Sequence, residues 1–258
     1  MPSILFEIKD QLAIIRFNRP DKLNAFNREM GLLFLDRLGD CEASPGIRAV
    51  YITGMGKGFS AGQDLAEVMD PGGPAVAGML SDVYNPVVSG IRKLNKPVLA
   101  AVNGVAAGAG ANIALCCDIV VAAASASFIQ AFSKIGLIPD SGGTFFLPRL
   151  IGWQKASALF MLGERISASE AEQWGMIYKV FADENFEEAS LNMAQNLARM
   201  PTTALALIKH ALNNSMFNSL ETQLSLENEL QQKAAGTRDY KEGVQAFLEK
   251  RQPGFKGN

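Results

Sequence analysis

The stretch from Lys96 to Thr144 constrains the fold of this chain more than any other segment. It begins with an apolar run, Pro97–Val102, whose length and Val content are typical of a buried strand. The turn signal Asn103-Gly104 follows, and residues 105–111 then carry no side chain larger than Val. Side chains this small let backbone N–H groups come close to a ligand or to another backbone segment. The pattern therefore predicts a buried strand that leads into a tightly packed, glycine-rich loop.

The rest of this stretch predicts two more buried elements and one charged position. Residues 112–117 are expected to form a short buried helix, and residues 118–123 are a second apolar, strand-like run. In the glycine-rich turn of residues 136–144, Asp140 is the one carboxylate. It could cap a following helix or act as an acid/base group, and its apolar neighbours would raise its pKa if it is buried.

Three interpretations of the small-residue loop stay open from this stretch alone. A dinucleotide-binding loop is the first, since Gly108-Ala109-Gly110 matches half of G-x-G-x-x-G, but Ile113 occupies the third glycine position. Tight backbone packing at the start of a helix is the second. The third is a backbone N–H group directed at an oxyanion that develops during a reaction.

Composition indicates an ordinary globular domain and excludes several classes of function. The 258 residues suffice for one large domain, or a domain with an appendage, and 48% of them are apolar. A net charge of −2 gives no electrostatic footprint for nucleic acid. No apolar run approaches the ~18 residues of a membrane span, and the N-terminus lacks the pattern of a secretory signal. We therefore expect a cytoplasmic protein that binds neither nucleic acid nor membrane.

Cysteine and histidine do not suggest a metal site. Cys116 and Cys117 are adjacent in an apolar segment and are expected to be buried small residues. The single histidine, His210, lies in a helical pattern with no motif beside it, so we expect it to be structural. No pattern typical of a metal, flavin or nicotinamide site is present.

Hydrophobic periodicity predicts a β-hairpin, a helix and a strand before the central stretch. Residues 4–8 and 12–17 are short β-prone runs separated by polar residues. Residues 24–46 have helical spacing, with Asn24 as the expected N-cap, and residues 49–53 form the next strand. Strand, helix and strand in this order form a βαβ unit, which argues for a parallel sheet.

Beyond Thr144 the chain is mostly helical. Ser169 is expected to cap a helix that ends at Gly175, and residues 176–181 could form the last strand. A terminal helical block of this kind often serves as a lid or an assembly surface, although the sequence shows only its helicity. The expected helices cover residues 145–150, 153–162, 169–174, 187 to about 200, a helix from 201, 220–235 and 238–251.

Residues 54–65 form a second glycine-rich loop before the central stretch. It lacks the G-K-[ST] ending of a P-loop, which argues against phosphate binding. In their order along the chain, four segments resemble those of the crotonase, or enoyl-CoA hydratase/isomerase, superfamily. They are GFSAGQDL (58–65), KPVLAAVNG (96–104), CDI (117–119) and GLIPDSGGT (136–144). The similarity covers nearly the whole chain, from residue 18 to residue 256.

The subgroup that the chain resembles most contains the isomerases of phenylacetate catabolism, which convert ring-1,2-epoxyphenylacetyl-CoA to its oxepin form. Residues 105–111, 131–140 and 172–177 carry that closer match. The resemblance implies an α/β fold in which repeated ββα turns form a spiral core, residues 1–196, followed by a helical trimerisation region, residues 197–258. It also implies a homotrimer or a dimer of trimers, an acyl-CoA substrate, and no cofactor beyond the coenzyme A of that substrate.

The resemblance also implies where the site lies. In the family two backbone N–H groups hold the thioester carbonyl, and here they fall at Ala61 and Ala109. Of the residues implied to bind the substrate or its CoA, Phe255 and Lys256 would reach the adenine and phosphate end, in the same or a neighbouring subunit. The full set is Lys22, Ala25, Ala61, Gly62, Gln63, Asp64, Leu65, Ala109, Phe255 and Lys256.

Two departures from the family pattern favour an isomerase over a hydratase. Hydratases carry one glutamate in the helix after the glycine-rich loop and another further along, but here Asn112 and Phe132 occupy those positions. Neither side chain can act as a general acid or base near neutral pH. Asp140 remains, at a position that some isomerases of the superfamily use, and one carboxylate suffices for a 1,3-proton shift. We expect an acyl-CoA isomerase with Asp140 as acid/base, while a Δ3,Δ2-enoyl-CoA isomerase, a weak hydratase and a non-catalytic binding protein stay open.

Overall fold

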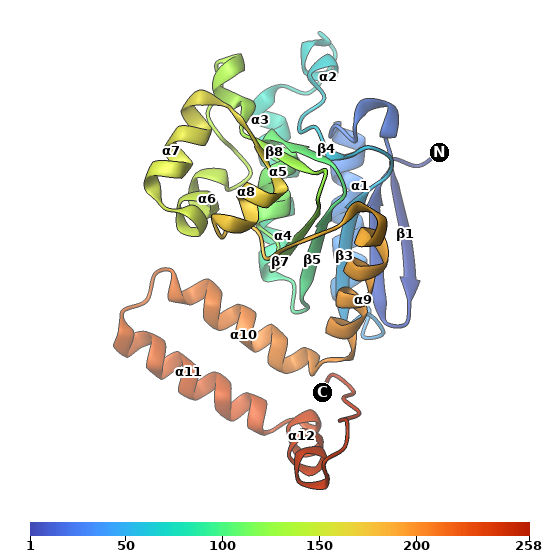
Figure 1. Ribbon diagram of the computed structural model, residues 1–258, viewed down its shortest axis with the longest axis vertical. Coiled ribbons are helices and arrows are strands. Elements are labelled where there is room, and N and C mark those ends of the chain that lie inside the picture. Colours follow the sequence, from blue (N-terminus) through green and yellow to red (C-terminus); the bar gives the residue numbers. More distant parts are fainter.

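The computed structural model describes residues 1–258, and its strands form two sheets around one core (Figure 1). The first sheet has the order β1-β2-β3-β5-β7-β10 and the second the order β4-β6-β8-β9. Only the pairs β1–β2 and β8–β9 are antiparallel. The strands are β1 (Ile4–Lys9), β2 (Leu12–Phe17), β3 (Ala49–Gly54), β4 (Gly58–Ser60), β5 (Val98–Val102), β6 (Val105–Ala107), β7 (Ile119–Ala123), β8 (Ser127–Ile129), β9 (Arg165–Ser167) and β10 (Lys179–Phe181).

The chain passes repeatedly from the first sheet to the second. β3 is followed by β4, β5 by β6, and β7 by β8, and helical segments come after each pair. These repeated ββα turns confirm the α/β spiral expected from the family resemblance. The hairpin β1–β2 and the parallel pairing of β2 with β3 confirm the prediction from periodicity.

Helices cover the outside of the two sheets and form the end of the chain (Figure 1). They are α1 (Arg28–Ala43), α2 (Leu65–Met69), α3 (Val76–Met79), α4 (Asn85–Lys93), α5 (Gly108–Leu115), α6 (Gly143–Ile151), α7 (Trp153–Leu162), α8 (Ala168–Gln173), α9 (Phe186–Arg199), α10 (Thr202–Ser215), α11 (Leu220–Ala235) and α12 (Arg238–Glu249). A π-helical turn, η2 (Leu80–Tyr84), comes directly before α4.

Two helix caps differ from the prediction. Helix α1 begins at Arg28 with Asn27 as its cap, because Asn24 has a left-handed backbone and its amide donates to two loop carbonyls instead. Helix α8 is capped by Ser167, in a capping box, and not by Ser169. In both cases the helix begins at a residue different from the one that periodicity indicated.

The last three helices extend away from the sheets (Figure 1). The ammonium of Lys209 in α10 donates to the carboxylate of Asp118 at 2.8 Å, which ties the helix to the start of β7. Arg48 donates to the carbonyls of Met200 and Phe255, so one guanidinium holds both ends of this tail. None of the helices has the length and apolar character needed to cross a bilayer.

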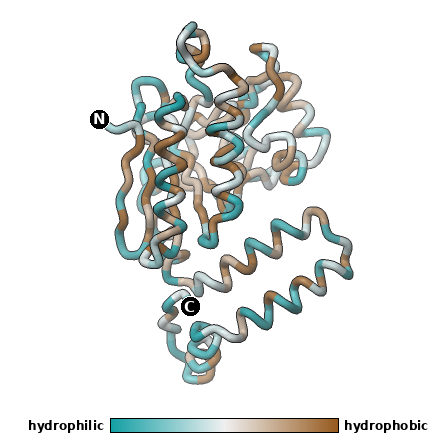
Figure 2. The backbone as a smooth tube through the Cα atoms, turned by 180° about the vertical axis from the view of Figure 1, so that it is seen from behind, coloured by the Kyte–Doolittle hydropathy of each residue, from teal (hydrophilic) through white to brown (hydrophobic).

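Apolar side chains of this tail are exposed to solvent. Figure 2 shows hydrophobic positions interspersed with hydrophilic ones along α10 and α11. The large exposed residues include Ile208, Leu212, Phe217, Leu224 and Phe247. These apolar side chains therefore lie on the surface of the tail and not in a core.

Candidate active site

Two glycine-rich loops meet beside the second sheet, one after β4 and the other at the start of α5. At Gly62 the φ angle is +90°, and a Cβ atom there would lie 2.8 Å from the carbonyl oxygen of Ala107 and 3.5 Å from the nitrogen of Ala109. Gly110 packs against Ser60 in a similar way, because a Cβ there would lie 2.6 Å from that side chain. Only glycine permits such an approach, so the loops are in backbone contact, as their small residues predicted.

A cavity of about 140 Å³ lies where the loops meet. Asp140 is the one charged residue in its wall, and most of the others are apolar. The lining comprises six residues predicted from the family resemblance, Ala61, Gly62, Gln63, Leu65, Ala109 and Asp140, together with Ala107, Gly108, Ala131, Phe132, Ile135 and Leu137.

Two backbone N–H groups in this wall lack the acceptor that regular structure would supply. The N–H of Gln63 makes no hydrogen bond, although the residues on either side of it both bond to Phe26. Ala109 is the second residue of α5, and the first N–H groups of a helix have no acceptor within it. The N–H of Ala61, in contrast, donates to the carbonyl of Leu23 at 2.9 Å. Ala61 therefore lines the cavity, but its N–H is satisfied within the protein.

Asp140 lies half-buried on the loop before α6 and borders the cavity. Its Oδ1 accepts a hydrogen bond from the hydroxyl of Ser141 at 3.0 Å. Burial raises the pKa of Asp140, and the hydrogen bond from Ser141 offsets only part of this rise. The alternative role as a helix cap is wrong, because α6 begins at Gly143 with Gly142 as N-cap and no side chain caps it.

Asn112 and Phe132 occupy the positions at which the resemblance would place the glutamates of a hydratase. Asn112 is buried, donates from Nδ2 to the backbone carbonyl of Asp140 at 2.9 Å, and accepts on Oδ1 from Gln130 at 2.8 Å. Phe132 is buried and contributes to the cavity wall. Asn112 thus holds the loop that carries Asp140, and neither residue supplies a group for proton transfer.

The predicted CoA residues near the N-terminus are organised by Arg19, which sequence reasoning missed. Lys22 is exposed at the end of a 3₁₀ turn, η1 (Pro20–Lys22), and Ala25 is buried just after it. The guanidinium of Arg19 pairs with Asp64 at 2.8 Å and donates to the carbonyl of Ala25. Burial would raise the pKa of Asp64, but Arg19 and backbone N–H donors outweigh it and hold this pKa below its ordinary value. The family resemblance begins at residue 18 and so includes Arg19, but it implied no role for the Arg19 side chain.

Phe255 and Lys256 lie away from the cavity of their own chain. The carbonyl of Phe255 accepts from Arg48 at 3.0 Å, just before β3, whereas the cavity lies beyond the other end of that strand. The N–H of Lys256 donates to Asp239 in α12 at 2.7 Å. One chain therefore does not bring this pair to the other predicted CoA residues, and their contribution to a neighbouring subunit stays a prediction.

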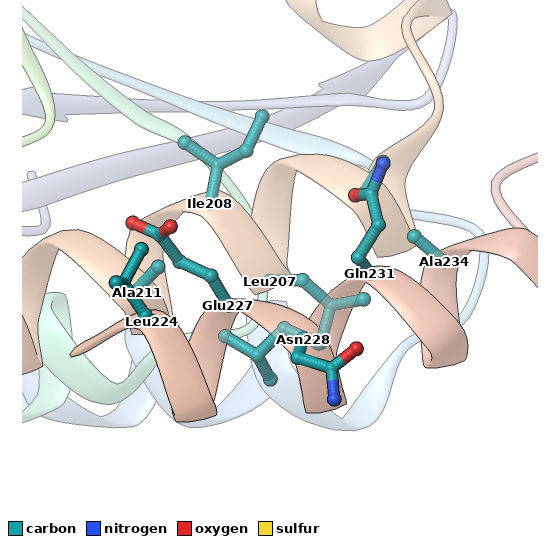
Figure 3. A pocket seen from close by; sticks show the side chains of 10 residues that line it. Leu207, Ile208, Ala211, Leu224, Glu227, Asn228, Gln231 and Ala234 are labelled. Atoms are coloured by element: carbon teal, nitrogen blue, oxygen red, sulfur yellow. The ribbon is translucent and has the colours of Figure 1, made fainter. Parts of the chain in front are cut away.

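A larger cavity, of about 570 Å³, lies between α10 and α11 (Figure 3). Glu227 is the one charged residue among its mostly apolar walls. Neither glycine-rich loop borders it, and no group of three His, Cys, Asp or Glu side chains in the structure is placed to hold a metal ion. The smaller cavity joins a carboxylate to the backbone of both loops and is therefore the candidate active site.

Comparison with known proteins covers the whole chain. Residues 7–258 match the model of the family described as enoyl-CoA hydratase/isomerase. An Escherichia coli K12 protein named 1,2-epoxyphenylacetyl-CoA isomerase is 48% identical, over 100% of this chain and 99% of that protein. A Rhodobacter capsulatus protein named "Probable enoyl-CoA hydratase" is 43% identical, over 99% of this chain and 98% of that protein.

Solved structures agree with the sequence comparison. The crystal structure of an enoyl-CoA hydratase from Bacillus anthracis superposes with a TM-score of 0.92 at 32% identity, over 99% of this chain and 100% of that one. These matches cover the two sheets, the two glycine-rich loops with the cavity between them, and the helical tail. The chain therefore belongs to the enoyl-CoA hydratase/isomerase family, the crotonase superfamily, and is an acyl-CoA enzyme of that family.

Proposed function

We propose that the protein is an acyl-CoA isomerase that acts through a thioester enolate, with Asp140 as its single acid/base group. Its substrate is ring-1,2-epoxyphenylacetyl-CoA, which it converts to oxepin-CoA, or a β,γ-enoyl-CoA, or both. One observation carries this proposal: the small cavity combines a single carboxylate with the backbone of both glycine-rich loops. The E. coli isomerase at 48% identity supports the choice of substrate.

The N–H groups of Gln63 and Ala109 form the oxyanion site in this proposal. Negative charge develops on the thioester oxygen as the neighbouring carbon loses its proton, and each backbone donor would stabilise it by roughly 2.7–4 kcal/mol. Gln63 replaces Ala61 in this role because the N–H of Ala61 already donates to Leu23. Backbone donors do not depend on side-chain chemistry, which is compatible with an alanine and a glutamine at these positions.

Asp140 takes the proton from the carbon beside the thioester and returns it at another position of the acyl group. One carboxylate suffices, because the first step leaves it protonated and the second restores it. The raised pKa that burial gives Asp140 favours this exchange, since the protonated form is then less unstable near neutral pH. The hydrogen bond from Asn112 to its backbone carbonyl, 2.9 Å long, keeps the loop in position.

An enoyl-CoA hydratase is the second candidate, because relatives carry that name. Addition of water by two carboxylates needs a second acid/base group, and Asn112 and Phe132 offer none. A non-catalytic binding protein is the third possibility, and the carboxylate in the cavity wall argues against it.

The test is to incubate the purified protein with ring-epoxide, β,γ-enoyl and α,β-enoyl thioesters of CoA in parallel, to separate the products by chromatography and to measure the mass of each. New chromatographic peaks with the mass of the substrate, from the first two thioesters, support the isomerase. Addition of water to the α,β-enoyl substrate alone would identify a hydratase. Binding of all three without turnover would indicate a non-catalytic protein.

We also propose that the chain forms a homotrimer, or a dimer of trimers, in the cytoplasm, and needs no cofactor beyond the CoA of its substrate. The exposed apolar residues of the tail support the assembly, because monomeric proteins rarely expose large apolar patches. The cavity of about 570 Å³ between α10 and α11 opens on the same surface, because Ile208 and Leu224 line it (Figure 3).

A further inference from the structure

Gln130 is a buried amide that the chemistry proposed above does not use. It follows β8 directly, and Ile129, the last residue of that strand, pairs with Ala107, the last residue of β6. Gln130 and Gly108 therefore leave the second sheet from neighbouring positions, at the edge where the candidate active site lies. Gln130 is 1% exposed, and its Nε2 donates to Oδ1 of Asn112 at 2.8 Å. Its side chain thus reaches from the end of β8 to α5.

The hydrogen-bonding capacity of the neighbouring groups fixes the orientation of this amide. The carbonyl of Asp140 can only accept, so Asn112 turns Nδ2 toward it, at 2.9 Å, and Oδ1 toward Gln130. Only Nε2 of Gln130 can then face Asn112, because the opposite orientation would place two oxygen atoms together. Oε1 of Gln130 is left buried with no hydrogen-bond partner. An unsatisfied buried acceptor is destabilising, so its presence beside the candidate active site needs an explanation.

The loop that Asn112 contacts has an unusual backbone. Ser141 has a φ of +50° and Gly142 a φ of +76°, and left-handed conformations are uncommon for residues other than glycine. The carbonyl of Asp140 accepts from the N–H of Gly143 at 2.8 Å as well as from Asn112. A Cβ on Gly143 would overlap Nδ2 of Asn112. The amide of Asn112 thus fits tightly against a loop whose conformation depends on the structure around it.

Helix α5 carries both this amide and a proposed oxyanion donor. Ala109 lies one helical turn before Asn112 in α5, which packs against β8 and α6 (Figure 1). The amide that Gln130 orients therefore joins the helix of the oxyanion donor to the loop of the acid/base group. Misplacement of a reacting group by about 1 Å can cost 10²-fold in rate, so this connection matters for catalysis.

We propose that Gln130 is a positioning residue: by orienting the amide of Asn112, it fixes the carboxylate of Asp140 relative to the N–H of Ala109. This inference rests on the proposed function and adds to it a residue outside the cavity wall, which therefore acts only through Asn112. Without the bond from Gln130, the amide of Asn112 can turn around, and its Oδ1 would then repel the carbonyl of Asp140. The unpaired Oε1 is explained as well, since the amide that supplies Nε2 also carries this oxygen.

Proton abstraction from phenylacetyl-CoA in D₂O tests the inference without any isomerisation. This thioester has an acidic carbon beside its carbonyl but no epoxide and no double bond outside its ring. Mass spectrometry then measures how fast the wild type and Gln130→Met exchange deuterium into that carbon at saturating thioester. Gln130→Met keeps the length of the side chain and removes the donor, so the exchange rate should fall at least about tenfold. Its affinity by calorimetry should stay within about twofold, because Gln130 does not line the cavity.

Tyr51→Phe is the matched control for the loss of one buried hydrogen bond. It removes a hydroxyl in β3 that lies 2.9 Å from that of Ser190 in α9, and it should leave both the exchange rate and the affinity unchanged.

A double-mutant cycle shows whether Gln130 acts through Asn112. Asn112→Ala should lower the exchange rate at least as much as Gln130→Met does. The double variant should then be no slower than Asn112→Ala alone, because Gln130 has no other connection to the loop of Asp140. Losses that add in the double variant would overturn the inference.

Two results with Gln130→Met would also overturn it: an unchanged exchange rate, or a loss of affinity as large as the loss of rate. If this variant does not fold, Gln130→Glu replaces it. The introduced carboxyl donates to Asn112 while protonated and cannot once ionised, so the ratio of its rate to the wild-type rate should fall as pH rises. A constant ratio would count against the proposal.

Failure of the proposed function is recognised separately. A wild-type protein that exchanges no deuterium has no enolate chemistry, and both proposals then fall. A wild-type protein that exchanges deuterium but gives no isomer in the product analysis loses the isomerase proposal alone, and the comparison with Gln130→Met still decides the role of Gln130.

Discussion

Replacing Asp140 by asparagine tests the proposed chemistry at the reacting group. The amide has the same shape, and its oxygen can still accept the hydrogen bond from Ser141, but it cannot exchange a proton near neutral pH. General acid–base catalysis contributes about 10²–10⁴-fold, so kcat for isomerisation should fall by at least about 10²-fold. The N–H groups of Gln63 and Ala109 remain, and the affinity for acyl-CoA should therefore change little.

The dependence on pH gives an independent measure of the same group. Because burial raises the pKa of Asp140, kcat/KM of the wild type should rise with pH through a midpoint above about 3.9, the ordinary pKa of aspartate, and then level off. The effect on stability has the opposite direction. The folded state binds this proton more tightly than the unfolded chain, so stability falls as pH rises from the unfolded pKa through the folded pKa. Asp140→Asn should lack that decrease and melt at or above the wild-type temperature near neutral pH.

The assay combines steady-state isomerisation rates with thermal unfolding at acidic and neutral pH. Asp82→Asn is the matched control, since it removes an exposed carboxylate that pairs with Arg28 at 3.1 Å and should leave kcat unchanged. An Asp140→Asn variant that isomerises acyl-CoA at close to the wild-type rate would refute the proposed role. If the variant loses activity and its melting temperature also falls clearly below that of the wild type, the carboxylate has a structural role instead.

Three further predictions concern the loop at Gly62, the residue Lys256 and the assembly. Gly62→Ala places a methyl group 2.8 Å from the carbonyl oxygen of Ala107 at a φ of +90°, so it should displace the Gln63 donor and lower kcat by about 10²-fold in steady-state assays; a normal rate would exclude this N–H from catalysis. Lys256→Glu should weaken CoA binding while bound substrate still turns over, and an unchanged Kd by calorimetry would remove Lys256 from the site. Sedimentation should show a trimer or a hexamer, and a stable monomer at micromolar concentration would contradict the assembly.

The long elements of the fold and the last strand, β10, were predictable from the sequence, and the three-residue strands of the second sheet were not. The hairpin, β5, β7 and the tail helices follow clear periodicity, and their bounds agree with the prediction to within a few residues. Hydrophobic periodicity did not predict the second sheet. Its strands β4, β6, β8 and β9 have only three residues each, too few to show an alternation of apolar and polar side chains. Helix α5 begins at Gly108 and not at residue 112, since the glycines and alanines of its first turn carry no periodic signal.

The candidate site was predictable in location but not in its hydrogen bonds. Asp140 and the two glycine-rich loops were recognised as motifs, and the structure places them around one cavity. Which N–H group is free depends on bonds from this loop to Leu23 and Phe26, far away in the sequence, and no local pattern reports them.

Arg48 makes the helical tail a closed loop of chain. The tail leaves the core at Met200 and returns at Phe255, and both carbonyls bond to this one side chain. Asp239 holds the C-terminal segment by accepting hydrogen bonds from the N–H groups of Lys256 and Gly257, each at 2.7 Å. The apolar surface of the tail is therefore ordered when a single chain folds. The proposed association between chains would then cost little conformational entropy, because the surfaces that would meet already have their shape.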